Sequence, residues 1–242
     1  MDKSIWYSKT SVMGIINVTP DSFSGDGFGI NFDSAISQAV QFVKDGADII
    51  DVGGESTRPP NLYKNVKEIS VSEEIERVIP VIEGIRSQSD VCVSIDTSKS
   101  EVAIEAIRAG ATIVNDIWGL KKDSKLVKVI ADNNVCVVIM HNALSDTYSD
   151  VVTDTINDLK QSIDFAENNG VERSKIIVDP GFGFAKNLNH NLEIIRRLSE
   201  YKFLESPILI GPSRKSTIGK ILDLPVDDRL EGTSALVAVS IY

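Results

Sequence analysis

Residues 46–51 read GADIID, and residues 110–115, 64 positions later, read GATIVN. In both stretches a glycine follows a helical pattern and precedes an apolar run that ends in an acid or an amide. Gly46 and Gly110, like Gly170 further on, are therefore expected to adopt a positive φ and to close a helix just before a strand begins. The two stretches are either an internal repeat or two independent solutions to the same turn between a helix and a strand.

Short apolar runs of this kind alternate along the chain with longer segments of helical period. We interpret seven runs as strands: 12–18, 47–52, 91–96, 112–117, 135–141, 175–179 and 207–211. Apolar residues recur at i, i+3 and i+4 in the segments between them, as in amphipathic helices: 33–44, 72–86, 99–108, 123–132, 153–168 and 188–204. This alternation is typical of βα units around a parallel sheet.

Polar side chains stand at or just after the carboxyl end of every one of these runs. They are Asn17, Asp51, Asp96, Asn115 with Asp116, His141 with Asn142, Asp179, and Ser213 with Arg214. In a (β/α)8 barrel this end carries the chemistry, whereas in an open doubly wound sheet only the loops near one point converge. No Gly-x-Gly-x-x-Gly follows the first run, so we expect an α/β fold of the TIM-barrel type.

The number of strands falls one short of a closed barrel. Eight strands are needed for closure, and the sequence contains seven candidate runs. Residues 227–242 read as the helix that follows the seventh strand. We therefore expect a single barrel domain over residues 1–242 that is incomplete at its C-terminal end and lacks the eighth strand.

Charge and apolar patterning exclude several classes of protein. The chain has 25 Lys and Arg residues against 35 Asp and Glu residues, a formal charge of −10, which disfavours nucleic acid and anionic membranes as partners. No leader-like apolar segment is seen at the start, and no stretch reaches the roughly 18 apolar residues of a membrane span. Cys92 and Cys136 lie inside apolar runs, where a thiol acts as a small buried hydrophobe. A cytoplasmic protein is expected.

The first two predicted loops suit a metal ion and a phosphate group. Residues 17–27, NVTPDSFSGDG, are rich in oxygen donors, and Asn17 can provide one ligand to Mg²⁺ while water and a diphosphate provide the others. A plain surface turn is the other interpretation of this loop. Residues 51–60, DVGGESTRPP, combine backbone amides freed by two glycines with a hydroxyl and the Arg58 guanidinium, the groups that hold phosphate.

Three strand-end residues suit a flat heterocycle. Asp96, Asn115 and Asp179 project from different strands, and carboxylates and amides together match an amidine-like edge. Buried carboxylates without partners are costly, so a ligand or the nearby Lys215 is expected to satisfy them. Taken singly, each such Asp could instead cap a helix. Phe184, in the loop after Asp179, could line a substrate or the core.

Other chemistries fit the sequence poorly. GPSRKSTIG at residues 211–219 resembles a phosphate loop in composition but lacks the Walker A spacing. His141 and His190 are the only histidines, too few for a zinc cluster, and no Ser or Cys lies in a nucleophile elbow.

In order along the chain, six motifs resemble those of the dihydropteroate synthase family: MGIINVTPDSFS (13–24), residues 51–59, SIDT (94–97), VNDI (114–117), residues 179–184 and SRK (213–215). The resemblance runs from about residue 11 to the last residue. It implies that 4-aminobenzoate condenses with the diphosphate ester of 6-hydroxymethyl-7,8-dihydropterin, with help from Mg²⁺. It also implies small-molecule substrates as partners and, as is common in the family, a possible homodimer.

The resemblance further assigns roles to individual residues. Asp96, Asn115, Asp179 and Lys215 would hold the pterin, Asn17 the metal, and Thr57 and Arg58 the diphosphate. Phe23, Pro59, Phe184 and Ser216 would frame the aminobenzoate. Lys215, Arg58 and Asp96 are the residues expected to carry catalysis.

The chain departs from the family pattern in three places. It ends before the family's Arg-x-His on the eighth strand, it reads SGDG at residues 24–27 where relatives place the Asp directly after the Ser, and it has His141-Asn142 after the fifth strand. Two other functions stay open: a pterin-binding domain that transfers a methyl group from methyltetrahydrofolate, and a truncated module that binds pterin without turnover.

Overall fold

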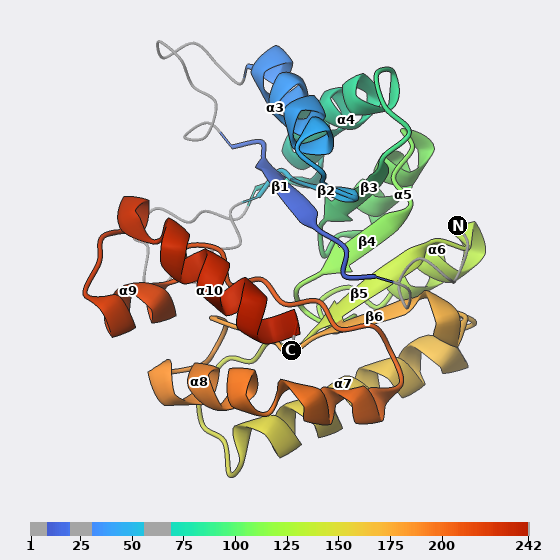
Figure 1. Cartoon of the computed structure of the whole chain (residues 1–242). Coiled ribbons are helices and arrows are strands. Elements are labelled where there is room, and N and C mark those ends of the chain that lie inside the picture. Colours follow the sequence, from blue (N-terminus) through green and yellow to red (C-terminus); the bar gives the residue numbers. More distant parts are fainter. Residues whose placement is uncertain (1–8, 20–30, 56–68, 242) are drawn as a thin grey trace.

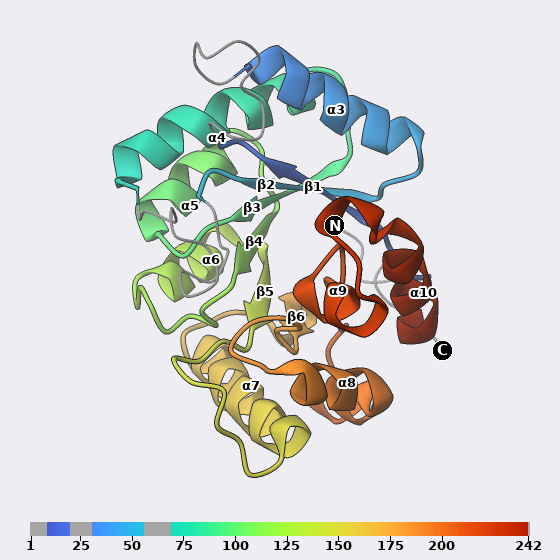
Figure 2. The same ribbon diagram turned by 90° about the vertical axis from the view of Figure 1, so that its left-hand side faces the viewer.

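A computed structural model describes residues 9–19, 31–55 and 69–241. Six parallel strands form one sheet in sequence order, each paired with the next: β1 (Met13–Asn17), β2 (Ile49–Gly53), β3 (Cys92–Asp96), β4 (Ile113–Asp116), β5 (Cys136–Met140) and β6 (Ile176–Asp179). Parallel neighbours in this order require a helical crossover between strands. Figure 1 shows those crossovers, and in Figure 2 the helices surround a curved sheet. The α/β fold and six of the predicted strands are confirmed.

The crossovers follow the amphipathic segments. The helices are α3 (Phe32–Lys44), α4 (Val71–Arg86), α5 (Ser100–Arg108), α6 (Leu126–Asn133), α7 (Val151–Asn168), α8 (Leu188–Arg196), α9 (Ser216–Leu222) and α10 (Leu230–Ile241). Side chains of Asn31, Ser70, Asp150 and Asn187 accept hydrogen bonds from the first turns of α3, α4, α7 and α8. These caps satisfy amide groups that have no partner inside the helix, so they fix where each helix begins.

One predicted helix was wrong, one helix was missed, and one begins later than expected. Segment 188–204 is not one helix, because α8 is followed by a 3₁₀ helix at Leu198–Leu204. Tyr201 and Leu204 are both buried, and residues three apart share one face in 3₁₀ geometry. Helix α9 was not predicted, and the segment expected as a helix over 227–242 is a 3₁₀ turn at Val226–Asp228 followed by α10.

The seventh predicted strand is only a short parallel bridge. Val178 of β6 pairs with Ile208; its N–H donates to Pro207 O at 2.9 Å, and Leu209 N–H donates to Val178 O at 2.8 Å. Pro207 has no N–H of its own, which limits the ladder at this point. The 207–211 run therefore follows β6 as a barrel strand would, without forming a regular strand. In the described part of the chain the sheet is curved but not closed.

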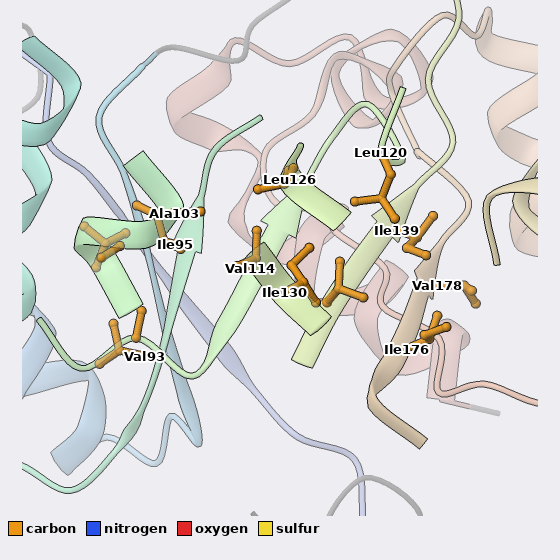
Figure 3. Packing of buried hydrophobic residues seen from close by; sticks show 14 of the residues in the cluster. Val93, Ile95, Ala103, Val114, Leu120, Leu126, Ile130, Ile139, Ile176 and Val178 are labelled. Carbon is orange, nitrogen blue, oxygen red and sulfur yellow. The ribbon is translucent and has the colours of Figure 1, made fainter. Parts of the chain in front are cut away.

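Each strand alternates between two apolar layers. Outward-facing residues such as Val93, Ile95 and Val114 pack against the helices, as Figure 3 shows. Inward-facing residues form a second cluster of Ile49, Ile113, Cys136, Val138 and Ile177, with Cys92 packed against it. Cys136 is a buried member of this cluster and Cys92, which is partly buried, packs against it, so both thiols lie among apolar groups as predicted. The inner cluster fills the amino-terminal half of the sheet's interior and leaves the carboxyl end to polar side chains.

The predicted helix-closing glycines adopt the expected conformation. φ is +107° at Gly46, +116° at Gly110 and +93° at Gly170. At Gly110 a Cβ would also lie 2.6 Å from Arg86 Cδ, so a side chain there would displace its neighbour. Among residues 9–19, 31–55 and 69–241, no helix is both long and apolar enough to cross a bilayer.

Candidate active site at the carboxyl ends of the strands

Strand register places three predicted residues in one row, together with Gly53. Asn17 is the register partner of Gly53, Gly53 of Asp96, and Asp96 of Asn115, across β1 to β4. A Cβ on Gly53 would lie 3.4 Å from Asp96 Oδ2 and 3.7 Å from Asn17 Oδ1. The missing side chain therefore leaves space between a carboxylate and an amide oxygen at the mouth of the sheet.

The floor of this row contains buried acids without cationic partners. Asn115 Nδ2 donates to Asp51 Oδ2 at 3.0 Å, while Asp51 Oδ1 and Asp96 Oδ1 are buried and have no hydrogen-bond partner. Burial raises the pKa of Asp51, and burial together with the charge of Asp51 raises that of Asp96 well above its ordinary value. Buried acceptors of this kind are costly unless a ligand brings donors to them.

The second half of the site is built on the end of β6. Asp179 Oδ1 accepts the N–H of Gly181 at 2.7 Å, and burial raises its pKa while the nearby Lys215 ammonium opposes that rise. Lys215 Nζ donates to Phe182 O and lies 4.6 Å from the centre of the Phe184 ring. Burial lowers the pKa of Lys215 to about 8, although Asp179 favours the charged form.

Gly183 allows this approach of Lys215. Its φ is +84°, and a Cβ there would lie 2.7 Å from Lys215 Cδ. The glycine therefore has a steric role as well as a conformational one.

The structure brings together part of the predicted set. Asn17, Asp96 and Asp179 end their strands at the same pole, where Asn115 is the penultimate residue of β4. Lys215 and Phe184 join Asp179 there. Ser216 follows Lys215 directly as the first residue of α9. Phe23, Thr57, Arg58 and Pro59 lie outside the described residues.

Two further groups beside the site were not predicted to belong to it. Asp51 was predicted as a strand-end acid, but its hydrogen bond with Asn115, across β3, was not predicted. Lys186 Nζ hydrogen bonds to His141 Nδ1 at 2.9 Å and to Phe184 O at 3.0 Å, and burial lowers its pKa to about 7. A lysine two residues after Phe184 was the only signal in the sequence for this contact.

The oxygen atoms at this end of the sheet fit a hard cation such as Mg²⁺ that takes most of its ligands from water and a bound substrate. In the described part of the chain, no three His, Cys, Asp or Glu side chains form a metal cage. Asn17 Oδ1 and Asp96 Oδ2 both border the space left by Gly53, and Asp96 Oδ1 has no hydrogen-bond partner. Mg²⁺ usually retains several waters and takes few protein ligands beside substrate phosphates, so this site suits it.

Comparison with known proteins gives a consistent result. Residues 13–242 match the family model described as "Pterin binding enzyme". The chain is 48% identical to the dihydropteroate synthase of Bacillus subtilis over 233 aligned residues. The alignment covers 96% of this chain and 80% of that protein.

Solved structures agree. The dihydropteroate synthase of Clostridium difficile, determined in the presence of pteroic acid, has a TM-score of 0.91 and 47% identity and covers 96% of this chain and 87% of that one. The Xanthomonas albilineans dihydropteroate synthase with 4-aminobenzoic acid has a TM-score of 0.90 and 37% identity, covering 96% of this chain and 84% of that one.

Proposed function

Because this chain belongs to the pterin-binding enzymes, and among them to the dihydropteroate synthases, we propose that it condenses 4-aminobenzoate with (7,8-dihydropterin-6-yl)methyl diphosphate. The products are dihydropteroate and diphosphate, and the protein is a transferase of folate synthesis. The observation that carries this proposal is the set of aspartates at one pole of the sheet: Asp51 and Asp96 each have a buried oxygen without a partner, and Asp179 is buried near the Lys215 ammonium.

The pterin ring supplies what these side chains lack. Its amidine-like edge carries N–H donors, and Asp96 and Asp179 can accept them, while Asn115 can both donate and accept. Lys215 has three N–H groups and uses one on Phe182 O, so it can donate to a ring acceptor. Binding the ring would thereby bring a donor to Asp96 Oδ1, which is buried and has no hydrogen-bond partner.

The reaction needs a leaving group and an electron-rich ring rather than a protein nucleophile. The bond from the methylene carbon to the diphosphate oxygen breaks, and the diphosphate departs with the electron pair. The arylamine nitrogen forms the new bond to that carbon and gives up a proton to solvent. By holding the ring, Asp96, Asn115, Asp179 and Lys215 would fix the methylene carbon where the amine can reach it.

The negative charge of the diphosphate leaving group would be stabilised at the mouth of the site. Asn17 would hold Mg²⁺, which when bound neutralises charge on the diphosphate. Thr57 and Arg58 are proposed to bind the diphosphate, and Phe23, Pro59, Phe184 and Ser216 to frame the aminobenzoate. The Phe184 ring beside Lys215 supports a place for an aromatic partner next to the pterin.

Purified protein tests the proposal directly. Incubation with both substrates and Mg²⁺ should give dihydropteroate by chromatography and an equal amount of diphosphate. Asp96→Asn and Lys215→Met should lose most of this activity, whereas Arg108→Gln, an exposed pair with Glu105 on α5, should retain it. Pterin binding without product would favour a non-catalytic module, and methyl transfer from methyltetrahydrofolate would favour the methyltransferase.

A further inference from the structure

Lys186, in the loop between β6 and α8, joins two parts of the chain beside the site. Its Nζ donates to Phe184 O at 3.0 Å and hydrogen bonds to His141 Nδ1 at 2.9 Å. His141 directly follows β5 and lies 45 residues away in the sequence, whereas Phe184 belongs to the same loop as Lys186. The lysine therefore links the main chain of this loop to the end of a neighbouring strand.

The surroundings of His141 determine which atom donates in this contact. The side chain is buried, and burial followed by the charges of Lys186 and Lys121 lowers its pKa to about 3, so the ring is neutral. Its Nε2 lies 3.9 Å from Oδ2 of Asp158 on α7, and Asp158 pairs with Lys121. A neutral imidazole carries one N–H group, and with that hydrogen on Nε2, toward the carboxylate, Nδ1 accepts from Lys186. His141 thus orients Lys186, which has a second N–H group for Phe184 O.

The first half of the loop after β6 is held by groups of the pterin site. Asp179 Oδ1 accepts from the N–H of Gly181 at 2.7 Å, and Lys215 Nζ donates to Phe182 O. Neither contact involves Lys186. Removing the Lys186 side chain should therefore leave this half of the loop in place.

The second half of the loop is held from outside the pterin site. Phe184 N–H donates back to Gly181 O at 3.0 Å, while Phe184 O accepts from Lys186. Tyr148 OH donates to Ala185 O at 2.9 Å, and Lys186 Nζ lies 5.9 Å from the centre of the Tyr148 ring. Ala185 has a φ of +45°, a left-handed conformation that persists only where surrounding contacts hold it. Lys186 therefore fixes the main chain that carries the Phe184 ring.

The Phe184 ring is the part of this half that reaches the site. Its centre lies 4.6 Å from Lys215 Nζ, near Asp179 at the carboxyl end of β6. Contacts between aromatic rings depend on their relative orientation, so a displaced ring would lose much of its contact with an aromatic ligand.

We propose that Lys186 is a positioning residue for the arylamine: by holding Phe184 O it sets where the Phe184 ring lies beside Lys215, without touching either substrate. The inference rests on the proposed function, because the aminobenzoate role of Phe184 comes from there. It predicts that Lys186 governs affinity for the arylamine separately from affinity for the pterin.

The test compares two ligands on the same variants. Lys186→Met should raise the Kd for 4-aminobenzoate by on the order of tenfold, by calorimetry on protein saturated with 6-hydroxymethylpterin and magnesium diphosphate. In the condensation assay the KM for 4-aminobenzoate should rise by a similar factor, with kcat within about twofold, because a binding contact is lost equally from ground state and transition state. Affinity for 6-hydroxymethylpterin alone should stay within about twofold of that of the unmodified protein.

A double variant separates positioning through Phe184 from a general effect on the fold. If Lys186 acts through the Phe184 ring, its loss should matter little once that ring is removed. Phe184→Ala/Lys186→Met should therefore bind 4-aminobenzoate within about twofold of Phe184→Ala alone. Losses that multiply would show that Lys186 acts independently of Phe184, against the inference.

Two further variants keep the test decisive. Lys186→Met/His141→Leu removes the unpaired ring nitrogen together with its donor, so it serves if the single variant folds poorly, and it should show the same selective loss. Lys175→Met is the matched control, because Lys175 Nζ also donates to a distant carbonyl, that of Asn134, but lies at the amino end of β6. It should leave both affinities unchanged.

The possible results separate this inference from the proposed function. Equal losses of affinity for both ligands would mean that Lys186 is merely structural, and an unchanged Kd for 4-aminobenzoate would also overturn the inference. If the unmodified protein forms no product, the proposed function fails, whereas its Kd for 4-aminobenzoate still reports on Lys186. If it does not bind 4-aminobenzoate either, the inference fails as well.

Discussion

Asn115 on β4 donates a hydrogen bond to Asp51 on β2 across the intervening strand β3, with 3.0 Å between Nδ2 and Oδ2. A carboxylate only accepts, so the amide must turn its NH₂ group toward Asp51 and its oxygen elsewhere. The bond thereby determines which half of the Asn115 amide remains for a ligand.

Changing Asp51 should therefore weaken pterin binding although Asp51 lies below the row of strand-end residues. In Asp51→Asn the new NH₂ group can face Asn115 and release its amide to rotate. We expect affinity for 6-hydroxymethylpterin to fall about tenfold, or roughly 1.4 kcal/mol, by calorimetry. Asp48→Asn, at the opposite end of β2, breaks the ion pair with Lys9 and should leave this affinity intact. Equal affinities for Asp51→Asn and the parent would contradict this role.

Lys215 should give pterin binding a dependence on alkaline pH. Its pKa of about 8 lies below the ordinary value, so its ammonium is lost as pH rises through that value. We expect affinity to fall between pH 7 and 9.5. Lys215→Met should bind more weakly by on the order of 1.5 to 3 kcal/mol at pH 7 and should lack this pH step. A step of the same size in the variant would assign it to another group.

His141 should make the protein sensitive to acid. Burial, and then the charges of Lys186 and Lys121, lower its pKa to about 3, and its Nδ1 accepts from Lys186 only when neutral. The unfolded chain binds the proton near pH 6.5 and the folded protein does not, so stability falls as pH drops below that value. At pH 4.5 the loss is about 2 to 3 kcal/mol.

The check on His141 is a difference between two proteins, because buried acids respond in the opposite direction. The free energy of unfolding is measured in urea at pH 7 and at pH 4.5. On going to pH 4.5, the parent should lose more stability, or gain less, than His141→Gln. Parallel changes in both would rule out His141 as the source.

Two glycines with positive φ should differ sharply when replaced by alanine. At Gly46, with φ of +107°, a Cβ meets nothing within 4 Å, so Gly46→Ala should cost only backbone strain, about 1 to 2 kcal/mol. At Gly181, with φ of +73°, a Cβ would lie 1.9 Å from His141 O. Gly181→Ala should cost at least about 3 kcal/mol in denaturant unfolding, since strain and overpacking combine. Similar costs at both positions would refute the steric argument.

Local pattern predicted the strands and most helices correctly. Six apolar runs became strands of a parallel sheet, in which strands are usually buried on both faces; β1, where Ile15 is 49% exposed, is the exception. The glycines before β2 and β4 have the expected φ. The 207–211 run and the 188–204 segment were less well predicted. Pro207 limits one ladder, and the burial of Tyr201 and Leu204 selects a tighter helix, effects that depend on neighbours distant in sequence.

For the site, the sequence predicted which residues lie at the same end of the sheet, but not which of them form hydrogen bonds with each other. Asn17, Asp96, Asn115 and Asp179 were predicted at one pole because parallel strands all end at the same edge of their sheet. The Asp51–Asn115 bond and the Lys186–His141 contact were not, since their partners lie 64 and 45 residues apart in the sequence. Apolar period reveals which face of a strand or helix is buried. The register and curvature of the assembled sheet then set which polar groups come within 3 Å of each other.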